Sequence, residues 1–111
     1  MKYLLLLSLL FTFNLSAKET KQWFEGGTLH KALVTEWNSS TIANQLATSA
    51  DWLLATDQGK EVAKADLSAM ALKLLSIELA SCVDEIAISP TMQKETANKV
   101  AAVCLVGLGI N

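Results

Sequence analysis

The chain has 111 residues, of which 51 % are hydrophobic and 18 % are charged, and its formal net charge is −2 at pH 7. This length provides for one domain at most. Its basic residues are all lysines interspersed with acids, so the chain lacks the arginines and the basic stripe that binding to nucleic acid or to anionic lipid relies on.

The first 17 residues have the three-part layout of a secretory signal peptide. Met1 and Lys2 form a short positive region, residues 3–13 form an apolar run, and the polar stretch that follows ends on the small residue Ala17. This layout predicts export with cleavage after Ala17, most simply to the periplasm. The apolar run is shorter than the roughly 20 residues of a spanning helix, so we expect no stable membrane insertion after cleavage.

Residues 18–27 are expected to form a lead-in that ends in a glycine turn, and residues 28–111 are expected to form a single helical domain. The pair Gly26-Gly27 indicates a turn that needs positive φ. Thr28 is a suitable N-cap, and the apolar positions 29, 32, 33 and 37 have helical spacing. A first helix is therefore predicted over residues 28–37.

A second helix is predicted from a cap at Ser39 or Ser40 to about Ala55. Its apolar residues recur at spacings of three and four, and Gly59 is the predicted C-cap of its end. The run Asn-Ser-Ser-Thr at 38–41 is a weak point for a helix, because these side chains compete for backbone hydrogen bonds. One bent helix over residues 29–55 is the alternative. Residues 60–65 form either a helical turn or a loop.

The clearest helical pattern covers residues 66–87, with Asp66 as its N-cap and a stripe that comprises Leu67, Met70, Leu74, Ile77, Cys82 and Ile86. Ser89-Pro90 then signals the start of a last helix that runs to about Val106. No segment alternates as a half-buried strand does. The predicted fold is all-α, a small bundle of about four helices with short loops.

Cys82 and Cys104 are the only cysteines, and an even pair in an exported chain predicts a disulfide. Straight helices that meet at Ser89 oppose this pairing, because they leave the two cysteines offset by about 12 Å along the helix axes. A disulfide needs Cα atoms within about 7 Å. An end of the third helix soon after Cys82 would bring them level. Two buried free thiols are the alternative.

Residues 23–37 contain two of the three tryptophans, two of the five glycines and the only histidine. Trp37 and Trp52 are predicted to fill the core. No helical stripe accounts for Trp23 and Phe24, which either staple the first helix or form a surface that binds a partner. The partner-binding hypothesis comprises Trp23, Phe24, Gly26, Gly27, His30 and Trp37.

The last twelve residues, VAAVCLVGLGIN, carry no charged side chain. A helix that is apolar on all sides must be buried on all sides. Val100–Asn111 is therefore predicted to be the central helix of the domain, or to be covered by a second molecule, which is either another copy in a homodimer or another envelope protein. Membrane insertion is a third reading, and the segment is too short to span a bilayer.

Catalytic and metal-binding motifs are absent from the sequence, and His30 has only the carboxylates Glu25 and Glu36 as polar neighbours of the right type. We therefore expect no enzyme, no cofactor and no metal site. The favoured interpretation is an exported, non-enzymatic, helical protein-interaction module. The alternatives are a module that binds a small ligand or metal at the Trp23–Trp37 corner, and an envelope stress chaperone or toxin-immunity type of inhibitor, whose general layout the chain shares.

Overall fold

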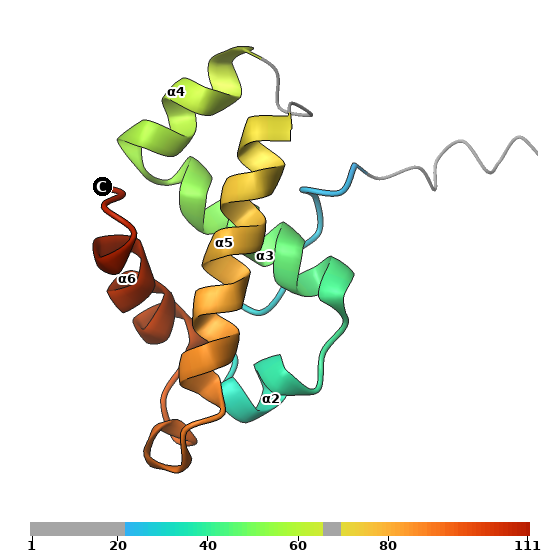
Figure 1. Ribbon diagram of the computed structural model, residues 1–111. Coiled ribbons are helices and arrows are strands. Elements are labelled where there is room, and N and C mark those ends of the chain that lie inside the picture. The colour runs from blue at the N-terminus through green and yellow to red at the C-terminus, as the bar shows by residue number, and fades with distance from the viewer. Residues whose placement is uncertain (1–21, 66–69) are drawn as a thin grey trace, which may run out of the picture.

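The computed structural model describes residues 22–65 and 70–111, which form helices and loops without a β-strand (Figure 1). The elements are α2 (Val34–Asn38), α3 (Ile42–Leu54), α4 (Asp57–Ala65), α5 (Met70–Ala87), the 3₁₀ turn η2 (Pro90–Met92) and α6 (Ala97–Gly107). The predicted all-α class is confirmed, with five α-helices in the described ranges where about four were predicted. The predicted signal peptide and the predicted cap at Asp66 lie outside these ranges. No described helix is long and apolar enough to cross a membrane.

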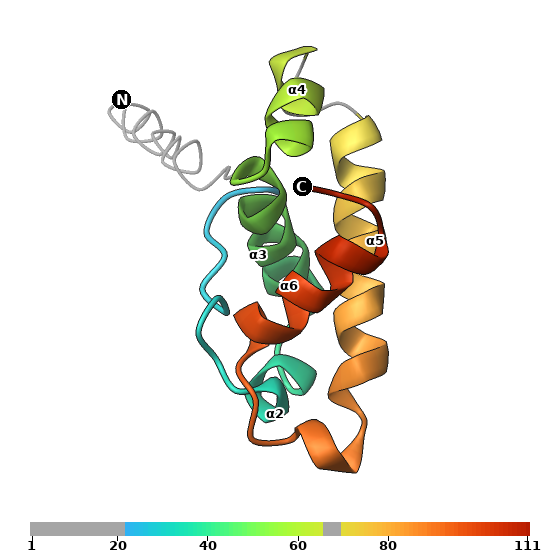
Figure 2. The same cartoon turned by 90° about the vertical axis from the view of Figure 1, so that its left-hand side faces the viewer.

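Helix α5 is the central element of the fold. It packs against α2, α3, α4 and α6, with α3 and α6 on either side of it (Figure 1) and α6 crossing it diagonally (Figure 2). Its buried face carries Leu72, Leu79 and Val83, which are fully shielded from solvent. Each such side chain contributes on the order of 1.5–3 kcal/mol by leaving water, so burial on α5 holds the other helices together.

The first helix begins six residues later than predicted, at Val34 instead of Thr28. Residues 26–29 are not helical, because the Thr28 N–H donates to Asn44 Oδ1 (2.9 Å) and the Leu29 N–H donates to Thr48 Oγ1 (3.2 Å), both on α3. Further along, the Val34 N–H donates to the carbonyl of Glu95 at 2.9 Å. These partners lie far away in sequence, and local spacing does not reveal them.

Gly26 and Gly27 serve this segment in two different ways. Gly26 has φ of 86°, which confirms the predicted turn with positive φ at this residue. Gly27 instead lies against α3, where a Cβ atom would overlap the backbone of Ala47 and Thr48. The absence of a side chain at Gly27 is therefore what lets residues 26–29 approach α3 closely enough to form their hydrogen bonds.

We expect Gly27→Ala to lower the free energy of unfolding by about 1–3 kcal/mol, because the added methyl group forces backbone against backbone. Gly107→Ala is the matched control, since a Cβ atom there meets nothing within 4 Å. It should leave stability unchanged or raise it by up to about 1 kcal/mol through helix propensity. Urea denaturation of the two variants measures both values. Equal effects in the two variants would contradict the close approach at Gly27.

The second helix has the predicted extent, but its caps differ. Its N-cap is Thr41, whose side-chain oxygen accepts the Asn44 N–H at 3.1 Å, and neither Ser39 nor Ser40 has this role. The chain leaves the helical path between α2 and α3, where Ser40 Oγ donates to the carbonyl of Trp37 at 2.6 Å. The alternative of one bent helix over residues 29–55 is therefore wrong.

Gly59 is not the C-cap of α3, which ends at Leu54 with Ala55 as its cap. It lies buried inside α4, because the chain turns into a new helix at Asp57. A Cβ atom at Gly59 would overlap the carbonyl of Leu53. This glycine therefore permits the tight corner between α3 and α4, and residues 60–65 are helical.

The last helix begins seven residues later than the Ser89-Pro90 signal predicted. Pro90–Met92 forms only a 3₁₀ turn, and α6 has Thr96 as its N-cap. The Gln93 side chain fastens this turn, since its Nε2 donates to the carbonyls of Ala87 and Ser89 at 2.8 Å each. These hydrogen bonds fold residues 88–96 back on the end of α5.

The predicted disulfide is confirmed, since Cys82 and Cys104 are bonded with their Cα atoms 5.9 Å apart. An end of the third helix soon after Cys82 is not what brings them level, because α5 continues to Ala87, the end predicted from its apolar stripe. The late start of α6 makes the pairing possible instead. Cys82 lies about 8 Å before the end of α5 and Cys104 lies about 11 Å after the start of α6, so the two are nearly level.

The C-terminal helix is not the central helix that its composition predicted. Only one face of α6 is buried, while Val103 and Val106 on the other face are 61 % and 79 % exposed. The end of the chain packs against α4, where Ile110 is buried and the carbonyl of Asn111 accepts the N–H of Asp57 at 3.1 Å. The alternative that a second molecule covers α6 stays a prediction.

Candidate functional site

The structure separates the six residues of the predicted partner-binding surface. Trp37 is fully buried and stacks on Trp52, with ring centroids 5.7 Å apart. Its indole N–H donates to Asp84 Oδ1 at 2.7 Å, which ties α2 to α5. Trp37 therefore belongs to the core, as one of the two readings of the tryptophans predicted, and Gly27 is a packing position against α3. Neither residue is available to a partner in this structure.

His30 lies beside α3 and forms a contact that its local sequence does not indicate. Its Nε2 is 2.8 Å from Asp51 Oδ2, and its ring packs edge-on against Trp52 at 6.0 Å. The two predicted carboxylate neighbours are engaged elsewhere, since Glu25 accepts the Gln22 N–H and Glu36 accepts the Leu33 N–H. The His30–Asp51 pair is partly exposed. Nowhere in residues 22–65 and 70–111 do three His, Cys, Asp or Glu side chains converge as a metal site needs.

Trp23 and Phe24 pack together at the surface, with ring centroids 5.6 Å apart in an edge-to-face arrangement. Trp23 is half-buried against the core, and the Lys73 ammonium of α5 lies 5.8 Å from its ring centroid. Beside this pair is a hollow of about 400 Å³, lined by Trp23, Gly26 and the start of α3. Trp23 and Phe24 thus serve as packing residues that also border a surface hollow.

A second hollow lies on the opposite side of α3, between α3 and α5. We call it the α3/α5 groove. It has a volume of about 350 Å³ and is lined by Ile42, Gln45, Leu46, Ile77, Ala80, Ser81 and Asp84. Its walls are mostly apolar, and they come from two helices that the core already holds in place. This rigid, apolar depression is the kind of surface that receives a side chain or helix of another molecule.

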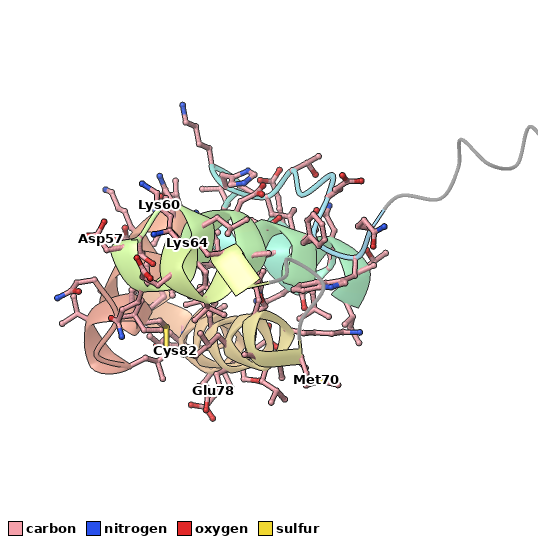
Figure 3. The ribbon with its side chains drawn as sticks, turned by 90° about the horizontal axis from the view of Figure 1, so that it is seen from above. Asp57, Lys60, Lys64, Met70, Glu78 and Cys82 are labelled. Carbon is pink, nitrogen blue, oxygen red and sulfur yellow. A yellow bond between two sulfur atoms is a disulfide. The ribbon has the colours of Figure 1, made fainter. Side chains whose placement is uncertain are left out.

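The outward face of α5 borders this groove and is unexpectedly apolar. Met70, Leu74 and Ile77 are 66 %, 54 % and 41 % exposed, and their spacing places them in one row along the helix. Met70 and Glu78 point away from the body of the protein in Figure 3. Ile42 at the start of α3 is 74 % exposed and lies across the groove from this row. Together these four apolar side chains form a patch, which we call the α5 patch.

Met70, Leu74 and Ile77 belong to the stripe that indicated this helix in the sequence, and the structure leaves all three exposed. Helix α5 carries two apolar faces, and the one that packs inward comprises Leu72, Ser76, Leu79, Ala80, Val83 and Ala87. The row with Met70, Leu74 and Ile77 faces solvent instead. Periodicity shows that a helix has an apolar face, but when two faces qualify it does not show which one is covered. The presence of both rows was the available signal for a surface patch.

Acidic side chains surround the C-terminal half of α5. Glu78, Asp84 and Glu85 are exposed, and none of them takes part in an ion pair among the described residues. The last turn of α5 contains no basic residue, although the C-terminal end of a helix favours positive charge. Asp84 lines the α3/α5 groove, whereas Glu78 and Glu85 line a neighbouring hollow toward α6. The apolar α5 patch is therefore bordered by acidic side chains on the C-terminal half of α5.

These features define a small, disulfide-linked helical domain whose central helix leaves one apolar face uncovered. No protein-family model, curated protein or solved structure matches the chain.

Proposed function

We propose that the protein is an exported, non-enzymatic protein-interaction module that binds its partner through the α5 patch. The carrying observation is the exposure of Met70, Leu74 and Ile77 on the helix that organises the fold. Contiguous exposed apolar side chains that polar residues surround often mark a surface that another molecule covers. The Cys82–Cys104 disulfide supports export, because such bonds persist in oxidising compartments.

The proposed surface differs from the one that the sequence alone suggested. Trp37 and Gly27 stabilise the fold, and the binding role passes to α5 and the start of α3. Trp23 borders the hollow on the other side of α3 and lies 5.8 Å from the Lys73 ammonium of α5.

The test is capture of a partner by the full chain, exported under its own N-terminal segment and recovered with its disulfide formed. We expect wild-type protein to capture one stoichiometric partner from an envelope extract, with the complex sized by light scattering. Leu74→Asp/Ile77→Asp should lose the complex. Val103→Asp/Val106→Asp, which places the same charges on the exposed face of α6, should retain it. Thermal melts of both variants should match wild type.

Three other outcomes would overturn this proposal. Loss of the complex only in the α6 variant would place the interface on α6. Capture of many unfolded proteins in sub-stoichiometric amounts would indicate a chaperone. No capture by wild-type protein, together with ligand or metal binding that His30→Ala abolishes, would favour the small-ligand alternative.

A homodimer through α6 is the second candidate, and the exposure of Val103 and Val106 on its outer face favours it. Residues 100–111 bear no charged side chain, so like-charge repulsion does not oppose contact between two copies there. The exposed apolar or small residues of this segment are nevertheless far fewer than the roughly 20–30 residues per side of a stable interface; they are Ala102, Val103, Val106, Gly107, Leu108 and Gly109. Light scattering of the purified protein alone, before and after Val103→Asp/Val106→Asp, tests this candidate.

A further inference from the structure

We propose that the partner presents a cationic amphipathic helix, whose apolar face packs into the α3/α5 groove and whose basic side chains face the acidic end of α5. This inference rests on the proposed function and specifies the chemistry of the partner. Three independent features carry it: the shape of the groove, the position of the exposed apolar side chains, and the distribution of charge.

The shape of the groove suits a helix. It runs between two helices, and its lining residues come from successive turns of each, with Ile42 and Leu46 on α3 and Ile77, Ala80 and Asp84 on α5. The groove extends about 10 Å along α5, from Ile77 to Asp84. With the exposed row that continues to Met70, the face is about 21 Å long, which corresponds to about four turns of a bound helix. Side chains spaced three and four apart on such a helix would meet the groove at matching intervals.

The exposed apolar side chains lie where the apolar face of that helix would rest. Ile42 and Ile77 stand on opposite walls of the groove, and Leu46 is half-buried between them. Leu74 and Met70 continue the row beyond the groove toward the start of α5. Burying this row would remove apolar surface from water at about 25 cal/mol per Å², which favours association.

Charge decides between a second copy and a different protein. Glu78, Asp84 and Glu85 are all exposed on the second half of α5, where Glu78 and Glu85 lie about 10 Å apart along the helix axis. Two copies that met through this face would bring these like charges together, and Lys73 is the only basic residue on α5. A partner with lysine or arginine beside its apolar face would instead neutralise them. The charge pattern therefore selects a cationic partner over a homodimer.

The test uses two designed helical peptides with the same leucine face, one with lysine and one with glutamate at the flanking positions. Fluorescence anisotropy measures binding of each peptide to the full exported chain. We expect the lysine peptide to bind at least tenfold more tightly than the glutamate peptide at low salt, with the difference shrinking as salt is added. Glu78→Gln/Glu85→Gln should lower the affinity for the lysine peptide at least tenfold. Leu74→Asp/Ile77→Asp should lower the affinity for the glutamate peptide.

Asp57→Asn/Glu61→Gln on α4 is the matched control, because it removes two negative charges away from the groove. It should change binding of the lysine peptide less than twofold. If the α4 and α5 variants lost affinity for the lysine peptide equally, the overall charge of the protein would explain the binding, and the inference would be overturned.

The same variants separate this inference from the proposed function. If the captured partner is lost in Leu74→Asp/Ile77→Asp but is unaffected by Glu78→Gln/Glu85→Gln and by salt, the interaction surface stands and the cationic partner is wrong. A homodimer that Glu78→Gln/Glu85→Gln strengthens and Ile77→Asp abolishes would also overturn the cationic partner. If neither peptide binds and wild-type protein captures no partner, both proposals are overturned.

Discussion

Replacement of Trp37 by alanine is expected to lower the free energy of unfolding by about 3–5 kcal/mol. Trp37 is fully buried, stacks on Trp52 and donates its indole N–H to Asp84, so the change removes contacts among α2, α3 and α5 at once. A domain of this size has a total stability on the order of 5–15 kcal/mol. The variant should therefore lose much of its cooperative unfolding transition, measured by urea denaturation followed by circular dichroism.

A matched pair of smaller substitutions separates the hydrogen bond from the packing. Trp37→Phe keeps an aromatic ring but leaves Asp84 Oδ1 without the indole N–H that it accepts. We expect this lost hydrogen bond to lower the free energy of unfolding by about 1–3 kcal/mol, beyond the effect of the smaller ring on packing. Trp23→Phe removes an indole N–H that is buried without a hydrogen-bond partner. That change should cost clearly less than Trp37→Phe. Equal costs would show that the Trp37–Asp84 hydrogen bond adds nothing to stability.

The second large effect concerns the disulfide. Cys82→Ala/Cys104→Ala should lower the free energy of unfolding by about 3 kcal/mol, because the bond closes a loop between residues 22 apart in sequence. The buried contacts of α6 are otherwise made mainly by small side chains, including Ala97, Val100 and Ala101. Helix α6 should therefore be the first element to lose hydrogen-exchange protection in the variant, ahead of α5.

Reduction of the wild-type protein with a thiol provides the control for this variant. Both should show the same loss of stability and the same early exchange in α6, since both remove only the cross-link. A loss below about 0.5 kcal/mol in the variant, or uniform loss of protection across all helices, would show that packing alone holds α6 on α5.

Local sequence determined those features whose causes lie within one turn of helix or within one residue. The extents of α3 and of the described part of α5 follow from apolar spacing, and the turn at Gly26 follows from the freedom of glycine. The lack of strands in residues 22–65 and 70–111 follows from the lack of alternation. The pairing of Cys82 with Cys104 was also predictable, because no other cysteine is available. Burial of Trp37 follows from the tendency of large aromatic residues to fill small cores.

Tertiary contacts decided what remained. Because of hydrogen bonds to α3 and to Glu95, the first helix begins only at Val34. Because the Gln93 side chain holds the preceding turn, α6 begins only at Ala97. His30 meets Asp51, which lies 21 residues away, so no local motif indicated the pair. Above all, α5 has two apolar faces, and only the packing of its neighbours shows that the row with Leu74 and Ile77 stays exposed. Periodicity records that a face is apolar, whereas the arrangement of the other helices decides whether anything covers it.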